Sequence, residues 1–505
     1  MERTPHCRTH RRRLGPTLAS LAAFGLLAGC AAGPAPSRSA PGEITVALGT
    51  SPINLDYTRS SGGAIPQALL YNVLETLLKI DSDGSLQPLL AESYEVSTDR
   101  LDYTFRLRHG VRFSNGTPMT AESVKFSFDR LPTWTTAGAK QLAGIKETRV
   151  LAPDVVQLHL ATPDNALPAA LAGPAGTIFS PDGVAALATA PIGTGPYTVN
   201  GYDPGTALRL VANDGYRAGP PPMRRITLTY YSDPTAQTNA LLTGGADVAI
   251  GITAPQLLAQ FRGNPDFTVT SGTTNGEMTL SMNNAAAPFD DLRVRQAVRQ
   301  AIDADAVREI AASGYGDPIT TMVPPSDPWY EKRPDPYPYD PQRARDLLAA
   351  AGQPHPTVTF KVPNQQVYIR AAQAVQSYLQ AVGFSVDLRI LEFPAVWLGE
   401  VYTARNYQLA IINHIEPRDI VSFSNPAFYL GYRNPRADTV LAAARSGPPA
   451  DYVSGMREYA RIVTDDAAAD FLYLTPWLGV AARGVAGQPQ NAASESIDLT
   501  RITRR

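Results

Sequence analysis

The 505-residue chain has few cysteines and no large excess of either charge. Its two cysteines, Cys7 and Cys30, both lie near the start, so the body of the chain has no disulfide to hold its core together. The same scarcity excludes thiol catalysis and a cysteine-ligated metal site in the body. A formal net charge of -2, from 44 basic and 46 acidic residues, excludes a strongly basic nucleic-acid binder. The length predicts two or three domains, and 44% hydrophobic residues predict that they are globular.

Motifs of catalysis and of metal binding are also missing. There is no phosphate-binding glycine loop, no His-Glu-x-x-His sequence and no nucleophile elbow. The four histidines after the first thirty residues are scattered, with no pair at ligand spacing: His109, His159, His355 and His414. Gly193–Tyr197 is rich in glycine, but its proline lacks a backbone donor and no helix pattern follows, which favours a structural turn. We therefore expect neither an enzyme nor a resident metal or cofactor.

The first thirty residues have the pattern of an export signal. Five arginines precede the apolar stretch Leu18–Leu27, and small residues follow it. The end of this stretch, Leu27-Ala28-Gly29-Cys30, resembles the lipobox of bacterial lipoproteins, in which the cysteine is lipidated. The stretch is too short for a membrane-spanning helix of about 20 apolar residues. The sequence therefore predicts a signal peptide at 1–29 and lipidation of Cys30.

Cleavage before Cys30 removes 29 of the 505 residues and is expected to leave 476. The exported chain has 39 basic and 45 acidic residues, a net charge of -6. Residues 31–41 are rich in Pro, Ser and Ala and predict a flexible tether. We expect a body anchored through Cys30 to the outer face of the cytoplasmic membrane, at the cell surface. Arg11–Leu14 matches a twin-arginine signal only weakly, so both export routes stay open.

Strand and helix patterns alternate along the body and predict an α/β protein. Strand patterns cover 103–108, 155–160 and 384–390, and helix patterns follow the cap residue Thr120 and cover 291–302, 341–352 and 365–382. Asp340-Pro341 has the form of a helix start, a capping residue followed by proline at the first helical position.

Several segments, in order, resemble family 5 of the solute-binding proteins of ABC importers, which includes peptide, nickel and oligosaccharide receptors. The most extensive is Tyr94–Arg130, with its Arg-Leu-Arg-His-Gly-Val-Arg-Phe-Ser-Asn-Gly-Thr-Pro run. The other matching segments are Leu69–Leu78, Gly193–Tyr197, Leu241–Val248, Asn283 with Pro288–Ala297, and Asp340–Gly352. Together the resemblance covers about residues 42–480.

This resemblance implies a two-lobed periplasmic-binding-protein fold of type II, cluster C, that closes on its ligand by a hinge. It divides the chain into lobe one (42–68, 189–270 and 475–505), a subdomain of lobe one (69–188) and lobe two (271–474). The hinge crossings are expected near Thr270–Ser271 and Leu474–Thr475.

The resemblance also implies a ligand site in lobe two. In peptide-binding members an aspartate pairs with the α-ammonium of the peptide, because a desolvated cation needs a fixed anion. The corresponding segment, Tyr407–Ile420, departs from that pattern. Alignment on its proline places Asn413 at the aspartate position, and an amide supplies no charge. A shifted alignment offers Asp419 instead, flanked by Glu416 and Arg418.

Other candidate contacts are weaker. His414, beside Asn413, suits polar contacts to a metal chelate, although the chain lacks further ligands for a bare ion. Ser51 and Asn54 lie where the N-terminal loop of the family faces the cleft. Asn275 and Glu277 follow the expected hinge, and Trp397 either lines the cleft or packs in the core. The alternative for the whole 413–419 segment is a solvated loop at the end of a strand.

The function implied is that of a monomeric, lipid-anchored solute-binding protein. It would capture a solute and deliver it to a membrane permease with a cytoplasmic ATPase. An oligopeptide or dipeptide is the first expectation, followed by a peptide-like or metal-chelate ligand such as a siderophore, then an oligosaccharide. An exported hydrolase and a signalling role without transport are the alternatives, and a nucleic acid is not expected as a partner.

Overall fold

The computed structural model describes residues 39–505. The predicted signal peptide, the lipobox and Cys30 lie outside the described residues. None of the helices in the described part combines the length and the apolar character that a membrane crossing needs.

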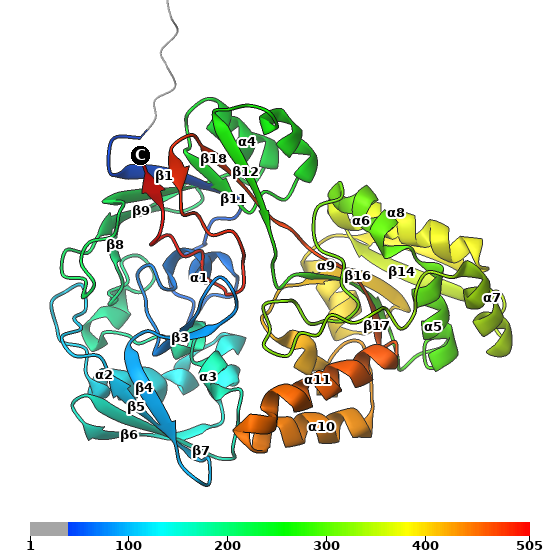
Figure 1. Cartoon of the computed structure of the whole chain (residues 1–505), viewed down its shortest axis with the longest axis horizontal. Coiled ribbons are helices and arrows are strands. Elements are labelled where there is room, and N and C mark those ends of the chain that lie inside the picture. Colours follow the sequence, from blue (N-terminus) through cyan, green and yellow to red (C-terminus); the bar gives the residue numbers. More distant parts are fainter. Residues whose placement is uncertain (1–38) are drawn as a thin grey trace, which may run out of the picture. The chain divides into compact units, whose positions relative to one another are not determined.

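A seven-stranded mixed sheet forms the first large core (Figure 1). Its central strand, β1, is buried along most of its length and pairs in parallel with β10 on one side and β11 on the other. The order across the sheet is β12 (Phe267–Gly272), β18 (Trp477–Ala482), β11 (Val248–Ile250), β1 (Glu43–Leu48), β10 (Arg225–Tyr230), β9 (Ala207–Ala212) and β8 (Tyr197–Asp203). Helices α1 (Ala64–Leu69) and α4 (Pro234–Leu242) pack against this core. We call the part of the molecule built on this sheet lobe one.

A four-stranded antiparallel sheet adjoins lobe one and has its own hydrophobic core. Its order is β4 (Ala91–Val96), β5 (Asp102–Leu107), β7 (Val155–Leu160) and β6 (Ile145–Ala152), accompanied by the hairpin β2 (Leu78–Ile80)–β3 (Leu86–Pro88) and helices α2 (Ala121–Asp129) and α3 (Leu167–Ala170). Thr120 caps α2 in a reciprocal arrangement with Ser123, as its position before the helix predicts. The predicted strands at 103–108 and 155–160 are confirmed.

A five-stranded sheet forms the second large core, and we call this part lobe two. Its order is β15 (Ser385–Leu391), β14 (Thr357–Pro363), β16 (Leu409–His414), β13 (Glu277–Met282) and β17 (Ala469–Leu474). Both faces are covered, since Leu409 and Ile411 of β16 belong to one apolar cluster and Ala410 between them to another. One face carries α5 (Leu292–Ala301), α6 (Ala304–Ala312), α7 (Pro341–Ala350) and α8 (Gln366–Ala381), and the other α9 (Ala395–Trp397), α10 (Pro435–Ser446) and α11 (Pro449–Asp465).

The helix starts in lobe two follow the capping chemistry of the sequence. The Asp291 carboxylate accepts a hydrogen bond from the Arg293 amide at the start of α5. The Asp340 carboxylate accepts from the amides of Gln342 and Arg343, and Pro341 occupies the first turn of α7. The helices predicted over 291–302, 341–352 and 365–382 are therefore confirmed to within two residues at each end.

The chain passes between the two large sheets twice. It leaves β12 after Gly272, enters β13 at Glu277, and returns from β17 to β18 through Thr475 and Pro476. The first crossing lies a few residues beyond Thr270–Ser271, the position expected from the sequence, because β12 stays paired with β18 as far as Gly272. At the crossings the Thr475 amide donates to the Gly276 carbonyl over 2.7 Å. A Cβ on Gly276 would stand 2.3 Å from the Thr475 hydroxyl, so this close approach requires glycine.

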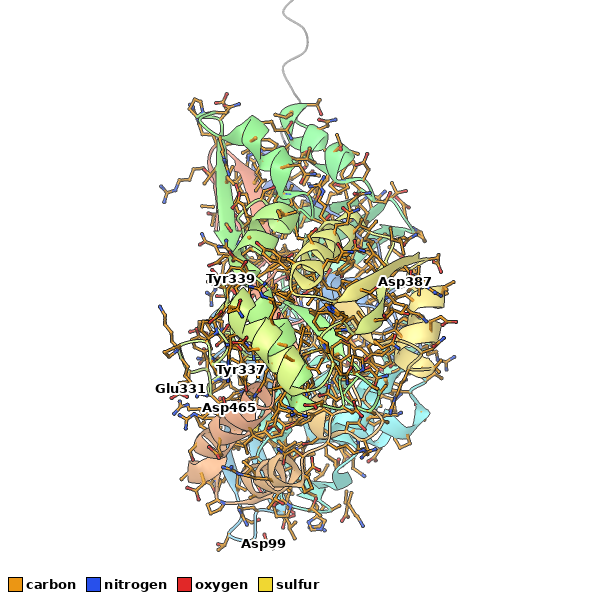
Figure 2. All side chains as sticks on the ribbon, turned by 90° about the vertical axis from the view of Figure 1, so that its right-hand side faces the viewer. Asp99, Glu331, Tyr337, Tyr339, Asp387 and Asp465 are labelled. Carbon is orange, nitrogen blue, oxygen red and sulfur yellow. The ribbon has the colours of Figure 1, made fainter. Side chains whose placement is uncertain are left out.

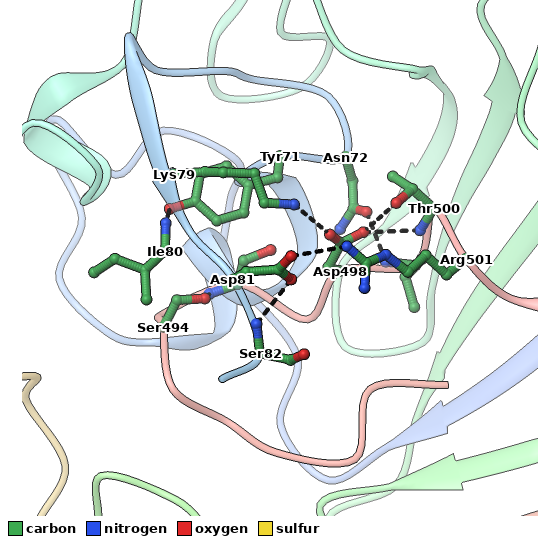
Figure 3. Close-up of polar contacts among 12 residues, drawn as sticks. Tyr71, Asn72, Lys79, Ile80, Asp81, Ser82, Ser494, Asp498, Thr500 and Arg501 are labelled. Atoms are coloured by element: carbon green, nitrogen blue, oxygen red, sulfur yellow. Dashed lines mark hydrogen bonds and ion pairs between the residues drawn. The ribbon is translucent and has the colours of Figure 1, made fainter. Parts of the chain in front are cut away.

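The C-terminal segment, residues 487–505, follows the short strand β19 (Val485–Ala486) and ends with β20 (Thr503–Arg504). Ion pairs fasten it to the β2–β3 hairpin beside lobe one (Figure 3): Lys79 contacts Asp498 over 2.9 Å, and Arg501 contacts Asp81 over 2.8 Å. The Asn72 amide also donates to the Ile497 carbonyl. These contacts fix the position of Glu495, which is part of the site described next.

Candidate functional site

Five carboxylates gather where the 414–419 segment meets its surroundings, and we call them the carboxylate cluster. Its members are Glu277, Asp327, Glu416, Asp419 and Glu495. Glu277 begins β13 and is paired in register with His414, the last residue of β16. Glu416 and Asp419 follow β16 directly, Asp327 comes from the loop between α6 and α7, and Glu495 comes from the C-terminal segment. The cluster thus draws on four separate stretches of the chain.

Three members of the cluster each have a buried carboxylate oxygen without a hydrogen-bond partner among the described residues. The exposed fractions are 1% for Glu277, 7% for Asp327 and 9% for the Asp419 side chain. Among the described residues, no group donates a hydrogen bond to Glu277 Oε2, Asp327 Oδ2 or Asp419 Oδ2. A buried polar atom left unpaired costs about 1–3 kcal/mol, and a charged one costs more. These oxygen atoms are acceptors that the protein itself does not satisfy.

Burial and mutual repulsion change the acidity of the cluster. Burial raises the pKa of Glu277 and that of Asp419 well above their usual range, and the charge of a neighbouring carboxylate adds to both shifts. Burial likewise raises the pKa of Asp327 to about 7, although Arg418 opposes the shift. The pKa of Glu495 rises to about 7, through burial and then through the charge of Glu416. Burial is the largest cause of each shift, because desolvation disfavours the charged form of a carboxyl group.

Arg418 is the cation of this site. Its Nε lies 3.8 Å from Asp327 Oδ1, and its guanidinium stacks 5.2 Å from the centre of the Trp329 ring. In residues 39–505, no other lysine or arginine nitrogen lies within 4.0 Å of a carboxylate oxygen of the cluster. Among the described residues, Arg418 is therefore the cation paired with the cluster, and its partner is Asp327.

His414 adds no charge at neutral pH, because burial lowers its pKa to about 4. Its Nε2 contacts the Tyr429 hydroxyl at 2.9 Å, and its Nδ1 lies 3.7 Å from Asp419 Oδ2. One ligand atom each from His414, Glu416 and Asp419 lie within 4.8 Å of one another. This trio has the donor types of a metal site, with one nitrogen and two carboxylate oxygens.

Two predicted asparagines lie at the edge of the cluster. The Asn413 amide donates to the Thr475 hydroxyl in the second crossing, and its Oδ1 has no hydrogen-bond partner among the described residues. The Asn275 amide donates to the Ala493 carbonyl, and its Oδ1 accepts from the Ser326 hydroxyl. Asn275 therefore ties the first crossing to the C-terminal segment, with both ends of its side chain occupied.

The remaining predicted residues, Ser51, Asn54 and Trp397, make local hydrogen bonds with residues outside the cluster. The Ser51 hydroxyl accepts from the Gly205 amide and donates to the Pro52 carbonyl. Asn54 stabilises its own turn, since its Oδ1 accepts a hydrogen bond from the Asp56 amide and its side-chain amide donates to the Ser60 hydroxyl. Trp397 is 1% exposed in the core of lobe two, where its indole N–H donates to the Lys361 carbonyl. We do not include these three in the site.

The structure brings five of the predicted residues together: Glu277, His414, Glu416, Arg418 and Asp419. It adds Asp327, Glu495 and Tyr429, which the sequence analysis missed. Asp327 and Glu495 stand far along the chain from the 413–419 segment, and Tyr429 lies ten residues beyond it; none of the three belongs to a local motif. Only the tertiary structure places them at the cluster.

Comparison with known proteins identifies the family of this chain. The model of bacterial extracellular solute-binding proteins, family 5, matches residues 85–430, more than half of the chain. The chain belongs to this family. Family 5 proteins are binding proteins and not enzymes, so this chain is an extracellular solute-binding protein of an ABC importer without catalytic activity.

Individual relatives agree with this assignment. The glutathione-binding protein GsiB of Salmonella choleraesuis (strain SC-B67) is 31% identical over 383 residues, covering 74% of this chain and 73% of that protein. NikZ from Campylobacter jejuni, solved with Ni(L-His), has a TM-score of 0.77 at 20% identity and covers 92% of this chain and all of its own. DppA from Helicobacter pylori, solved with the peptide STSA, has a TM-score of 0.77 at 21% identity, covering 92% of this chain and 98% of its own. The cluster C binding-protein fold predicted from the sequence is confirmed.

Proposed function

We propose that this family member captures a peptide or peptide-like ligand whose ammonium group enters the carboxylate cluster. The observation that carries the proposal is the pair of buried oxygens on Asp419 and Glu277 that have no hydrogen-bond partner among residues 39–505, while the cation of the site, Arg418, is paired with Asp327. An ammonium has three donors and one charge, so it satisfies both the hydrogen-bonding and the electrostatic deficit. Asp419 is the residue to which the shifted sequence alignment assigned this role.

The proposal includes lipidation of Cys30 after removal of the signal peptide. The supporting observation is the lipobox-like Leu27-Ala28-Gly29-Cys30 behind a charged and then apolar segment. The anchor would hold the monomeric protein at the outer face of the membrane, where closure of the two lobes on a ligand would present it to the permease. The cytoplasmic ATPase would then drive import.

A metal chelate is the second candidate. The trio of His414, Glu416 and Asp419 supports it, since their ligand atoms lie within 4.8 Å of one another. The His414 Nε2 contact with Tyr429 leaves Nδ1 as its free nitrogen. One nitrogen and two carboxylates would leave positions for the ligands that a chelator brings.

Thermal unfolding of the chain from residue 31 onward distinguishes the two candidates. A free-amine tripeptide such as Ala-Ala-Ala at about 100 times its dissociation constant is expected to add about 2.7 kcal/mol of stability. N-acetylation of the same peptide should abolish the shift, because it removes the cation. A shift with Ni(L-His)2 and none with any free-amine peptide would favour the chelate and refute the peptide proposal.

A further inference from the structure

A pocket in lobe two lies between helix α11 and the loop that joins α6 to α7, and we call it the arginine pocket. It contains about 350 Å³ of space that no protein atom fills. One wall is a single face of α11, because its residues recur at three- and four-residue spacing: Arg457, Ala460, Arg461 and Thr464. The facing wall comes from the loop and includes Trp329, Glu331 and Arg333. None of these residues belongs to the carboxylate cluster.

Positive charge predominates in the lining, with three arginines and one glutamate. Glu331 is occupied by Arg461, which donates to both of its oxygen atoms over 2.7 and 2.9 Å. These hydrogen bonds lower the pKa of Glu331 below its usual value, and the charges of all three arginines act in the same direction. Arg333 lies 3.9 Å from Asp465. In the described part of the chain, no carboxylate oxygen lies within 4.0 Å of an Arg457 nitrogen, so Arg457 is the cation that the protein leaves unbalanced.

Two buried N–H groups of the lining residues have no acceptor among residues 39–505. They are the indole Nε1 of Trp329 and the Nε of Arg457. Trp329 is 1% exposed, so its indole N–H is shielded from bulk solvent. A buried donor is normally paired, and one without an acceptor is destabilising. The pocket thus combines an unbalanced guanidinium with a second, neutral donor.

We propose that the arginine pocket binds a small oxyanion, such as phosphate or sulfate, whose oxygen atoms accept from Arg457 and from the Trp329 indole. An oxyanion supplies negative charge and several acceptors at once, whereas a neutral acceptor would leave the guanidinium unbalanced. The Trp329 ring also supports Arg418, which stacks 5.2 Å from its centre, so the pocket adjoins the ligand site. The proposal does not depend on which solute the carboxylate cluster binds.

The indole N–H groups allow a direct test by nuclear magnetic resonance. The chain has four tryptophans, so the chain from residue 31 onward, labelled with 15N-tryptophan, gives four indole signals. Trp329→Phe identifies the Trp329 signal by its loss. Titration with sodium phosphate at pH 8 and constant ionic strength should move this signal to saturation. The signals of Trp397 and Trp477 should stay in place, because these indoles already donate to the carbonyls of Lys361 and Pro489.

Two arginine variants locate the effect. Arg457→Gln removes the unbalanced charge and should weaken phosphate binding about tenfold to a hundredfold, as for a hydrogen bond to a charged group. The control is Arg389→Gln on β15, where the exposed Arg389 pairs with Asp387 over 2.7 Å. Figure 2 shows Glu331 and Asp465 at one edge of lobe two and Asp387 at the opposite edge. The control should leave the phosphate affinity unchanged, and circular dichroism checks that both variants fold.

The outcomes decide whether the pocket is an oxyanion site. A saturable shift of the Trp329 signal with phosphate or sulfate, weakened by Arg457→Gln and not by Arg389→Gln, would support it. An equal shift with sodium chloride would indicate a general effect of salt and would overturn the proposal. An unmoved Trp329 signal, or an Arg457→Gln variant that binds phosphate as tightly as the parent, would overturn it as well.

Discussion

Two buried carboxylate sites in this molecule are built in opposite ways. Glu75 in lobe one is 1% exposed, like Glu277 in lobe two. The Glu75 carboxylate accepts two hydrogen bonds from Arg217, at 2.7 and 2.9 Å, and one each from the hydroxyls of Thr194 and Tyr216. Glu277 Oε2 has no donor among the described residues, and neither does Asp419 Oδ2.

The difference separates a structural carboxylate from one that is kept for a ligand. A buried charge is tolerated when its own protein supplies a counter-charge and fills its lone pairs, as at Glu75. In the carboxylate cluster, Glu277 is equally buried but lacks these partners. The folded protein therefore holds an electrostatic deficit that an incoming cation can relieve, and this relief is a source of binding energy.

The largest expected effect comes from breaking the satisfied site. Glu75→Gln leaves the buried Arg217 guanidinium without its counter-charge, so the free energy of unfolding should fall by about 3–5 kcal/mol. Chemical denaturation measures this loss. Ligand affinity of the remaining folded protein should not change, because Glu75 lies outside the cluster. A loss below about 1 kcal/mol would show that the pair is not the structural element described.

Asp419→Asn should have the opposite effect on stability. Because the pKa of Asp419 is raised on folding, the native state binds more protons than the unfolded state above pH 4, and stability falls as the pH rises. Replacement by asparagine should therefore stabilise the unliganded protein at pH 8 by about 1–3 kcal/mol, and by much less near pH 4. Thermal unfolding at both pH values, with and without a free-amine peptide, measures the gain together with the expected loss of binding.

His414 also titrates over this pH range. It has a lowered pKa of about 4, so it acts in the opposite direction, destabilising the fold as the pH falls below about 6.5. Because its Nδ1 lies 3.7 Å from Asp419 Oδ2, its contribution changes with the substitution, so the stabilities at pH 8, above its titration range, are the ones to compare. An Asp419→Asn variant that is less stable than the parent at pH 8 would contradict an electrostatic deficit at this residue.

A third carboxylate, partly exposed and fully paired, should give the smallest effect. Asp164, next to lobe one, accepts from Arg445 at the end of α10 over 2.5 and 3.1 Å, and the adjacent Asn165 amide donates to the carbonyls of Ala444 and Gly447. In Figure 1 the end of α10 lies beside the region of α3 and β7. Asp164→Asn should cost about 0.5–1 kcal/mol, as for other solvent-accessible ion pairs.

The ion pair of Asp164 with Arg445 lies away from the carboxylate cluster and connects the four-stranded sheet beside lobe one to lobe two. Its loss should therefore favour the arrangement in which the two lobes are apart. In the Asp164→Asn variant we expect a severalfold weaker affinity for the ligand and little change in the free energy of unfolding. Small-angle scattering would report a larger radius of gyration in the variant without ligand. Unchanged affinity and unchanged radius would show that Asp164 and Arg445 do not contribute to closure.

Local signals in the sequence predicted much of the fold. The caps at Asp291 and Asp340 and the apolar stripe of α5 act within a few residues, so they are visible in a linear pattern. The glycines of the Gly193–Tyr197 motif are explained only in three dimensions. A Cβ on Gly193 would stand 1.9 Å from the Val73 carbonyl, which requires glycine for packing and not for phosphate binding.

The site was predicted in part, for a physical reason. Asp419 and Glu277 were found because the family resemblance pointed to the 407–420 segment and to the residues after the crossing. Asp327 and Glu495 were missed because a carboxylate in a loop is usually solvated, and only burial beside other carboxylates makes it unusual. Burial of this kind depends on contacts between distant segments, which no short pattern encodes.

A crystal structure of the chain from residue 31 onward with bound Ala-Ala-Ala is the most direct test of the central claim. The account predicts a ligand nitrogen within about 3 Å of a carboxylate oxygen of Asp419 or Glu277. A ligand bound elsewhere, or bound at this site with no cationic nitrogen against those carboxylates, would contradict it.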